Sequence, residues 1–215
     1  MGRGKAYREK GKLEEAKRDL NRAEELNKED PIVQTNVGLV YSQAGDFEKA
    51  KTHFLKAYEK ASEEAMNCDN LGLAYYHTGD LESALKYFNK AIERDPHSAL
   101  SHFHRGLVYL DNRDFKTAEA CMDEAIRLEP DDEMYCHTKG QVYERQNDPA
   151  LYDKAIEQFL KAIAINDMHI PSYFHLGKIY HLKHQLTDAL MCFNKVIGLE
   201  CNKEEVFKFL MDRHS

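Results

Sequence analysis

A glycine and a tyrosine recur together at a fixed interval along almost the whole chain. The interval is 34 residues, and the tyrosine always follows the glycine by three positions. The glycines are Gly4, Gly38, Gly72, Gly106 and Gly140, and the tyrosines are Tyr7, Tyr41, Tyr75, Tyr109 and Tyr143. A sixth pair, Gly177 and Tyr180, comes after 37 residues, so one unit contains three extra residues. A period of this length predicts an array of stacked repeats.

The unit at residues 65–98 has the pattern of a helical hairpin. Apolar residues recur at helical spacing in 67–78 and again in 81–92. Gly72 allows the two helices to approach closely, while Gly79 ends the first helix in the left-handed conformation and Pro96 stops the second. One hairpin cannot bury its outer face, so we expect neighbouring units to stack on each other.

The turn between the two helices changes after the third unit. The position of Gly79 is taken in the next three units by Arg113, Asn147 and His184. Of these side chains, asparagine tolerates the left-handed conformation best. The three extra residues of the fifth unit fall within 146–153. We therefore predict a longer turn there, with Pro149 at the start of the second helix.

This skeleton resembles the tetratricopeptide repeat, which has a small residue, an aromatic three positions later, and then Ala, Phe, Ala and Pro. The resemblance extends from Gly4 to about Asn202. The paired small residues are Ala16 and Ala23, Ala50 and Ala57, Ala84 and Ala91, Ala118 and Ala125, Ala155 and Ala162, Ala189 and Val196. The ring position is occupied by Leu20, Phe54, Phe88, Met122, Phe159 and Phe193. The tryptophan that the family often has early in the first helix is absent.

The resemblance implies an all-α fold, a right-handed superhelical solenoid of antiparallel helical hairpins. It divides residues 1–203 into six repeats, at approximately 1–30, 31–64, 65–98, 99–132, 133–169 and 170–203. Because each repeat of a solenoid contacts only its neighbours, we expect the array to be one domain.

The two ends of the chain depart from the period. Asn202 and Glu205 resemble a capping box, and an apolar stripe follows, formed by Val206, Phe207, Leu210 and Met211. We predict that 204–215 forms a C-terminal capping helix; the alternative is the start of a seventh hairpin. Gly4 already occupies the glycine position, so either the first helix is a turn short or the chain is part of a longer protein, which we favour.

Composition excludes several classes of partner and of location. The net charge is −7, with acidic and basic residues interspersed, which argues against a nucleic-acid partner. No apolar run approaches the length that crosses a membrane, and no secretion signal is visible. The five cysteines are odd in number and lack metal-site spacing, which favours a reducing, cytoplasmic location.

No pattern typical of catalysis is present, so we predict that the chain is not an enzyme and needs no cofactor. Phosphate-binding, nucleophile-elbow, zinc-protease and dinucleotide motifs are all missing from the sequence. His181 and His184 are three residues apart on a predicted helix and are the best candidates for a shared metal. Without a supporting carboxylate or cysteine they make a weak site, and we predict no metal.

The resemblance further implies a concave groove, lined by the first helix of each hairpin, that holds peptides. The register places the residue after each glycine, and the residue two before it, toward this groove. With neighbouring aromatic and polar side chains, the candidate binding residues are Asn36, Leu39, Asn70, Leu73, Phe103, His104, Leu107, His137, Thr138, Phe174, His175 and Lys178. Gln141 occupies the same position as Lys178 one unit earlier.

Two features of the candidate groove are similar to known modes of the family. Asn36 and Asn70 are similar to the asparagine ladder that binds a peptide backbone, although the ladder stops after these two. Leu39, Leu73 and Leu107 form an apolar row, which either binds a partner or packs within the array itself. The lysine and asparagine that clamp a terminal carboxylate in chaperone-binding relatives are replaced by Met1 and Lys5, so that clamp is not matched.

We therefore predict a scaffold or adaptor that binds a peptide or a helix of a partner protein in the concave groove. One alternative is the non-catalytic, substrate-recruiting repeat segment of a larger enzyme. The other is a structural block in a large assembly, in which the convex face and the ends make the contacts.

Overall fold

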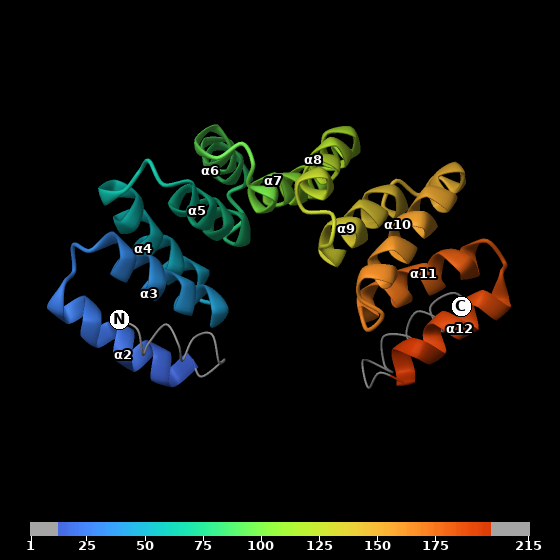
Figure 1. The fold of residues 1–215 in the computed structure, drawn as a ribbon, viewed down its shortest axis with the longest axis horizontal. Coiled ribbons are helices and arrows are strands. Elements are labelled where there is room, and N and C mark those ends of the chain that lie inside the picture. Colours follow the sequence, from blue (N-terminus) through green and yellow to red (C-terminus); the bar gives the residue numbers. More distant parts are fainter. Residues whose placement is uncertain (1–12, 199–215) are drawn as a thin grey trace. The chain divides into compact units, whose positions relative to one another are not determined.

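The computed structural model describes residues 13–198, and this part contains eleven α-helices, one short 3₁₀ helix and no strand (Figure 1). The helices are α2 (Leu13–Leu26), α3 (Pro31–Gln43), α4 (Phe47–Lys60), α5 (Ala65–His77), α6 (Leu81–Arg94), α7 (Ala99–Asp111), α8 (Phe115–Leu128), α9 (Glu133–Glu144), η1 (Pro149–Leu151), α10 (Tyr152–Ile165), α11 (Ile170–Leu182) and α12 (Leu186–Gly198). This confirms the all-α prediction. The predicted capping helix at 204–215 and the start of the first hairpin lie outside the described residues.

The helices alternate between two roles. We call α3, α5, α7, α9 and α11 the first helices, and α2, α4, α6, α8, α10 and α12 the second helices. The chain forms two compact units, Met1–Val108 and Tyr109–Ser215, and each is described separately below. The unit boundary falls within α7.

The N-terminal unit is built of hairpins that stack in chain order. Here α3 packs on α4 and α5 on α6, while α2 packs on α3 and α4 on α5. Gly38 and Gly72 lie against the rings of Phe54 and Phe88, so closely that a Cβ atom on Gly72 would lie 2.7 Å from the ring. The close approach predicted from the glycine position is confirmed.

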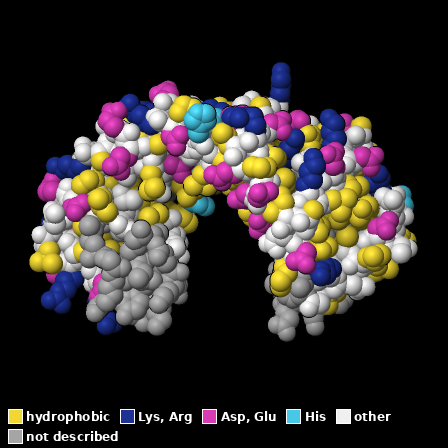
Figure 2. Space-filling view, in the orientation of Figure 1, with side chains coloured by type: hydrophobic (Ala, Val, Ile, Leu, Met, Phe, Trp, Pro, Cys, Tyr) yellow, Lys and Arg dark blue, Asp and Glu magenta, His cyan; other side chains and the backbone are white. Residues whose placement is uncertain are grey.

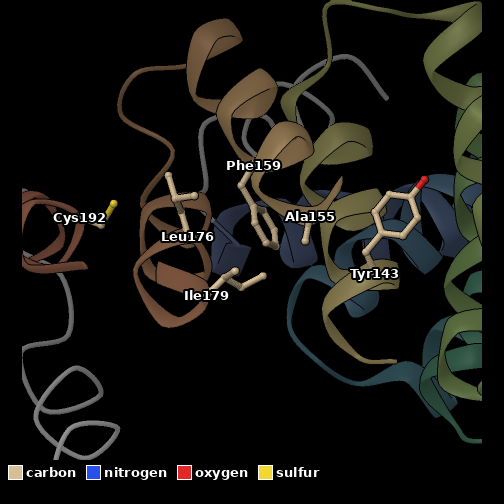
Figure 3. Packing of buried hydrophobic residues seen from close by; sticks show 6 residues of the cluster. All are labelled: Tyr143, Ala155, Phe159, Leu176, Ile179 and Cys192. Carbon is tan, nitrogen blue, oxygen red and sulfur yellow. The ribbon is translucent and has the colours of Figure 1, made fainter. Parts of the chain in front are cut away.

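The C-terminal unit has the same construction. Here α9 packs on α10 and α11 on α12, while α8 packs on α9 and α10 on α11. Figure 3 shows one of its core clusters, in which Ala155 and Phe159 of α10 lie between Tyr143 of α9 and Leu176 and Ile179 of α11. Because one cluster draws on successive hairpins, the stacking that the repeat period predicts supplies the core of this unit.

Five turns between first and second helices have a left-handed residue, whether or not it is glycine. Gly45 and Gly79 have φ of 77° and 85°. Arg113, Asn147 and His184 have φ of 61°, 54° and 59° at the equivalent positions. The geometry is therefore kept after glycine is lost, at a cost of about 1–2 kcal/mol for a residue with a side chain.

The three-residue insertion is wound into η1, which follows the turn and precedes α10. The Asp148 side chain accepts a hydrogen bond from the Ala150 amide at 2.9 Å and so caps this segment. The prediction that Pro149 starts the second helix is wrong by one 3₁₀ turn, since α10 begins at Tyr152. The extra turn absorbs the insertion before Ala155 and Phe159, which keep their repeat positions.

Candidate ligand-binding surface

The predicted groove residues of α3 and α5 are partly buried. Asn36 donates from Nδ2 to the carbonyl oxygen of Ile32 at 2.8 Å, so one of its amide donors serves its own helix. Nδ2 of Asn70 is buried and has no hydrogen-bond partner within residues 13–198. The two amides of the short asparagine ladder are therefore not equivalent.

The apolar row packs against the core and also keeps some exposed surface. Leu39 lies against the cluster that contains Phe54 and Leu71. Leu73 lies against the cluster of Ala84, Phe88 and Val108. Leu107 is also half-buried. The leucines of this row therefore contribute to packing while part of each remains accessible.

His104 and Phe103 of α7 are almost completely buried. Nδ1 of His104 lies 2.9 Å from Oδ2 of Asp69 on α5, and its ring packs against Phe88. The other carboxylate oxygen of Asp69 is buried without a hydrogen-bond partner in the described part of the chain. This pair ties two successive first helices together inside the N-terminal unit.

His137 and Thr138 of α9 are also buried, with 5% and 2% of their surface exposed. Nδ1 of His137 lies 3.0 Å from the hydroxyl of Ser172, and its ring is close to those of His169 and His175. Burial, followed by the charges of His175 and His169, lowers the pKa of His137 to about 3. This imidazole is therefore neutral at physiological pH.

Glu144 at the end of α9 is the centre of a charged group that sequence reasoning missed. Its carboxylate lies 2.5 Å from Nδ1 of His175 and accepts a hydrogen bond from Nζ of Lys178 at 2.6 Å. Burial would raise the pKa of Glu144, but the hydrogen bond and charge of His175, together with Lys178, outweigh it and hold the pKa below its ordinary value. Phe174, next to His175, is half-buried and lies beneath the Lys178 ammonium.

A polar cavity of about 380 Å³ opens beside this group in the C-terminal unit. Three predicted groove side chains, Gln141, His175 and Lys178, line it. The amide of Gln141 lies 3.3 Å from Nε2 of His175, and Arg145 donates to Asp111 at 2.8 Å. The remaining lining residues are Leu110, Arg113, Phe115, Glu144 and Asn147.

A second cavity, of about 370 Å³, has a mainly apolar lining from α10, α11 and α12. Leu160 and Met191 at its rim have 45% and 67% of their surface exposed. Figure 2 shows hydrophobic side chains gathered over the region of α10 and α11 in the C-terminal unit. Sequence reasoning did not identify this surface, because its residues also fit a core-facing helix pattern.

Within the described residues, no three His, Cys, Asp or Glu side chains are arranged to hold a metal ion, and His181 and His184 belong to no such group. The described cysteines are Cys68, Cys121, Cys136 and Cys192, all of them buried free thiols. Burial raises the pKa of the Cys192 thiol to about 11. None of the helices between residues 13 and 198 is long and apolar enough to span a membrane.

Family comparisons agree with the repeat skeleton. Models of the tetratricopeptide repeat match residues 30–97, 99–132 and 170–200, and a TPR repeat model matches residues 4–45. No curated protein sequence matches the chain.

Solved structures share the fold at low sequence identity. MamA from Desulfovibrio magneticus RS-1 is 21% identical with a TM-score of 0.68, over 81% of this chain and 97% of that one. YrrB, described as a TPR protein with an unusual peptide-binding site, is 22% identical with a TM-score of 0.63, over 91% of this chain and 98% of that one. A chain of the Cut9–Hcn1 hetero-tetramer of the APC/C is 15% identical with a TM-score of 0.84, over 95% of this chain and 40% of that one.

Proposed function

Because the chain belongs to the tetratricopeptide repeat family, we propose that it is a protein-interaction scaffold that binds a peptide or a helix of a partner protein. The proposed binding surface is the groove lined by the first helices. Repeats of this kind present successive first helices side by side, which suits an extended or helical ligand.

One observation carries this proposal. The polar cavity of the C-terminal unit is lined by Gln141, His175 and Lys178, which come from two successive first helices. They occupy the repeat positions that the register assigns to a ligand: Gln141 and Lys178 follow the repeat glycine, and His175 precedes it by two. A concave, polar site at these positions can receive ligand side chains while nearby half-buried leucines contact its apolar parts.

The remaining candidate residues divide by accessibility. Asn36, Leu39, Asn70, Leu73, Leu107 and Phe174 are half-buried and keep surface that a ligand could contact. Phe103, His104, His137 and Thr138 are almost completely buried, and we assign them the role of supporting the surface from behind. YrrB, which shares the fold, is described as having a peptide-binding site, and this supports a peptide as the ligand class proposed here. The free thiols also favour a reducing compartment.

A structural role in a larger assembly is the second candidate, and a different surface favours it. The apolar cavity formed by α10, α11 and α12 lies outside the proposed ligand positions. The chain of the Cut9–Hcn1 complex that resembles this protein in fold belongs to a hetero-tetramer. If this surface made the essential contacts, changes in the polar cavity would leave assembly intact.

Affinity capture with the full chain as bait distinguishes the two candidates. The groove variant is Gln141→Ala with Lys178→Ala, in which Glu144 keeps His175 as its partner. The control is Glu157→Ala with Lys161→Ala, an exposed pair on the second helix α10. We expect the control to retain the partner and the groove variant to lose it at unchanged helical content. Undiminished capture by the groove variant would refute the proposed binding surface.

A further inference from the structure

Cations outnumber carboxylates in the polar cavity. Arg113, Arg145 and Lys178 line it together with Asp111 and Glu144. Arg145 is paired with Asp111, and Lys178 and His175 are paired with Glu144. Arg113 is exposed and makes no ion pair with any residue in the described part of the chain. Among the described residues, the cavity therefore offers one guanidinium without an ion-pair partner.

The backbone conformation at Arg113 indicates that the turn itself does not require an arginine side chain. Its φ of 61° lies in the left-handed region, and the equivalent turns of the two preceding hairpins use Gly45 and Gly79. Asn147 replaces glycine one hairpin later, and it lines the same cavity. Non-glycine residues in this conformation persist where the surroundings or the function require them. Two such replacements thus place polar side chains at one cavity.

We infer that the cavity receives the carboxylate of an aspartate or glutamate side chain from the partner peptide, with the Arg113 guanidinium as its main contact. A guanidinium fits a carboxylate with two parallel hydrogen bonds. Arg145 and Lys178 already have carboxylate partners in Asp111 and Glu144, so Arg113 is the cation of the lining that is left for a ligand carboxylate. A phosphate carries nearly two negative charges and is usually bound by a cluster of arginines. This inference rests on the proposed function, because it names the ligand group at the same surface.

His184 provides a matched control for Arg113. It has φ of 59° at the equivalent turn of the last hairpin, it is exposed, and it does not line the polar cavity. Replacing either residue with glycine removes a side chain from a left-handed position, so both changes leave the turn geometry intact. Arg113→Gly additionally removes the cation from the cavity.

The test is selection of random twelve-residue peptides, displayed on phage by a fusion that leaves no free carboxyl terminus, with the full chain as bait. We expect the unaltered chain and the His184→Gly variant to select peptides enriched in Asp and Glu. The peptides selected by the Arg113→Gly variant should lack this enrichment. Selected peptides without acidic enrichment, or with the same enrichment for Arg113→Gly, would overturn the inference and leave the proposed function standing. Failure to select any peptide would contradict both.

Affinity measurements with one selected peptide, made with an amidated terminus, then test the contact between its acidic side chain and Arg113. We expect its Glu→Gln form to bind the unaltered chain about fivefold to tenfold more weakly, and Arg113→Gly to bind the original peptide with a similar loss. When the Glu→Gln peptide is measured against Arg113→Gly, affinity should fall little further than with either change alone, because each change removes the same contact. Additive losses, or tighter binding of a phosphoserine form than of the glutamate form, would refute the assignment of a carboxylate to Arg113.

Discussion

Gly72 and Phe88 are in such close contact that a Cβ atom on the glycine would lie 2.7 Å from Cδ1 and Cε1 of the ring. Phe88 is completely buried, so its ring has little room to move. The contact joins the two helices of one hairpin, and Gly38, Gly140 and Gly177 make similar contacts with Phe54, Phe159 and Phe193. The repeat glycine is thus a packing residue that sets the distance between α5 and α6.

Gly72→Leu should therefore destabilise the fold, by roughly 1–3 kcal/mol or more, because its side chain overpacks the interior of the hairpin. Gly79→Asn is the control: Gly79 has φ of 85° with no atom within 4 Å of an added Cβ, and asparagine tolerates this conformation. Thermal denaturation followed by circular dichroism measures both. Equal melting shifts would show that the two glycines do not have the distinct roles assigned here.

The packing glycines and the turns could be read from the sequence because they recur. A position that recurs along the chain reports a requirement shared by several units: Gly38, Gly72, Gly140 and Gly177 each lie beside a phenylalanine ring that leaves no room for a side chain. The left-handed turns were predictable for the same reason, even where Arg113 replaces glycine. By contrast, the 3₁₀ form of the insertion occurs once, and the period contains no information about it.

The charged group around Glu144 could not be predicted because it depends on one carboxylate in one unit. The equivalent positions of the preceding units are Ser42, Tyr76 and Leu110, so the repeat gives no signal. The sequence also could not separate a buried face from a binding face. His104 and His137 share the helical pattern of accessible residues, yet each is buried against a neighbouring helix.

Glu144→Ala should destabilise the C-terminal unit by roughly 3 kcal/mol, because it leaves His175 and Lys178 facing each other without the carboxylate that pairs with both. Glu157→Ala, which breaks the exposed pair with Lys161, should cause no measurable change. Chemical denaturation of both variants gives the comparison. Equal effects would mean that the Glu144 ion pairs are no more important for stability than a surface pair.

The stability of the protein should fall in mild acid through His137. Its pKa is about 3 when folded, against an ordinary value of 6.5. Between these values the imidazole of His137 binds a proton in the unfolded chain and not in the folded one. The contribution of His137 to stability therefore rises with pH from about 3 to 6.5 and is level above. The contribution lost at pH 5 is about 2 kcal/mol.

His137→Gln isolates this contribution, since glutamine is neutral at every pH and other histidines are unchanged. Between pH 7 and pH 5 the unaltered chain should lose more unfolding free energy than the variant, by about the amount above. Denaturant titrations at the two pH values measure the difference. The same pH dependence in both proteins would show that His137 titrates normally in the folded state.

Photo-cross-linking locates the ligand most directly. The photoreactive residue p-benzoylphenylalanine replaces Gln141 of the first helix α9 in one protein and Lys161 of the second helix α10 in another. Each protein is irradiated with a peptide selected by the unaltered chain, and the adducts are measured by mass spectrometry. A ligand held by the first helices predicts an adduct at position 141 and none at 161. An adduct at 161 alone, with an unmodified position 141, would contradict binding on the first-helix surface.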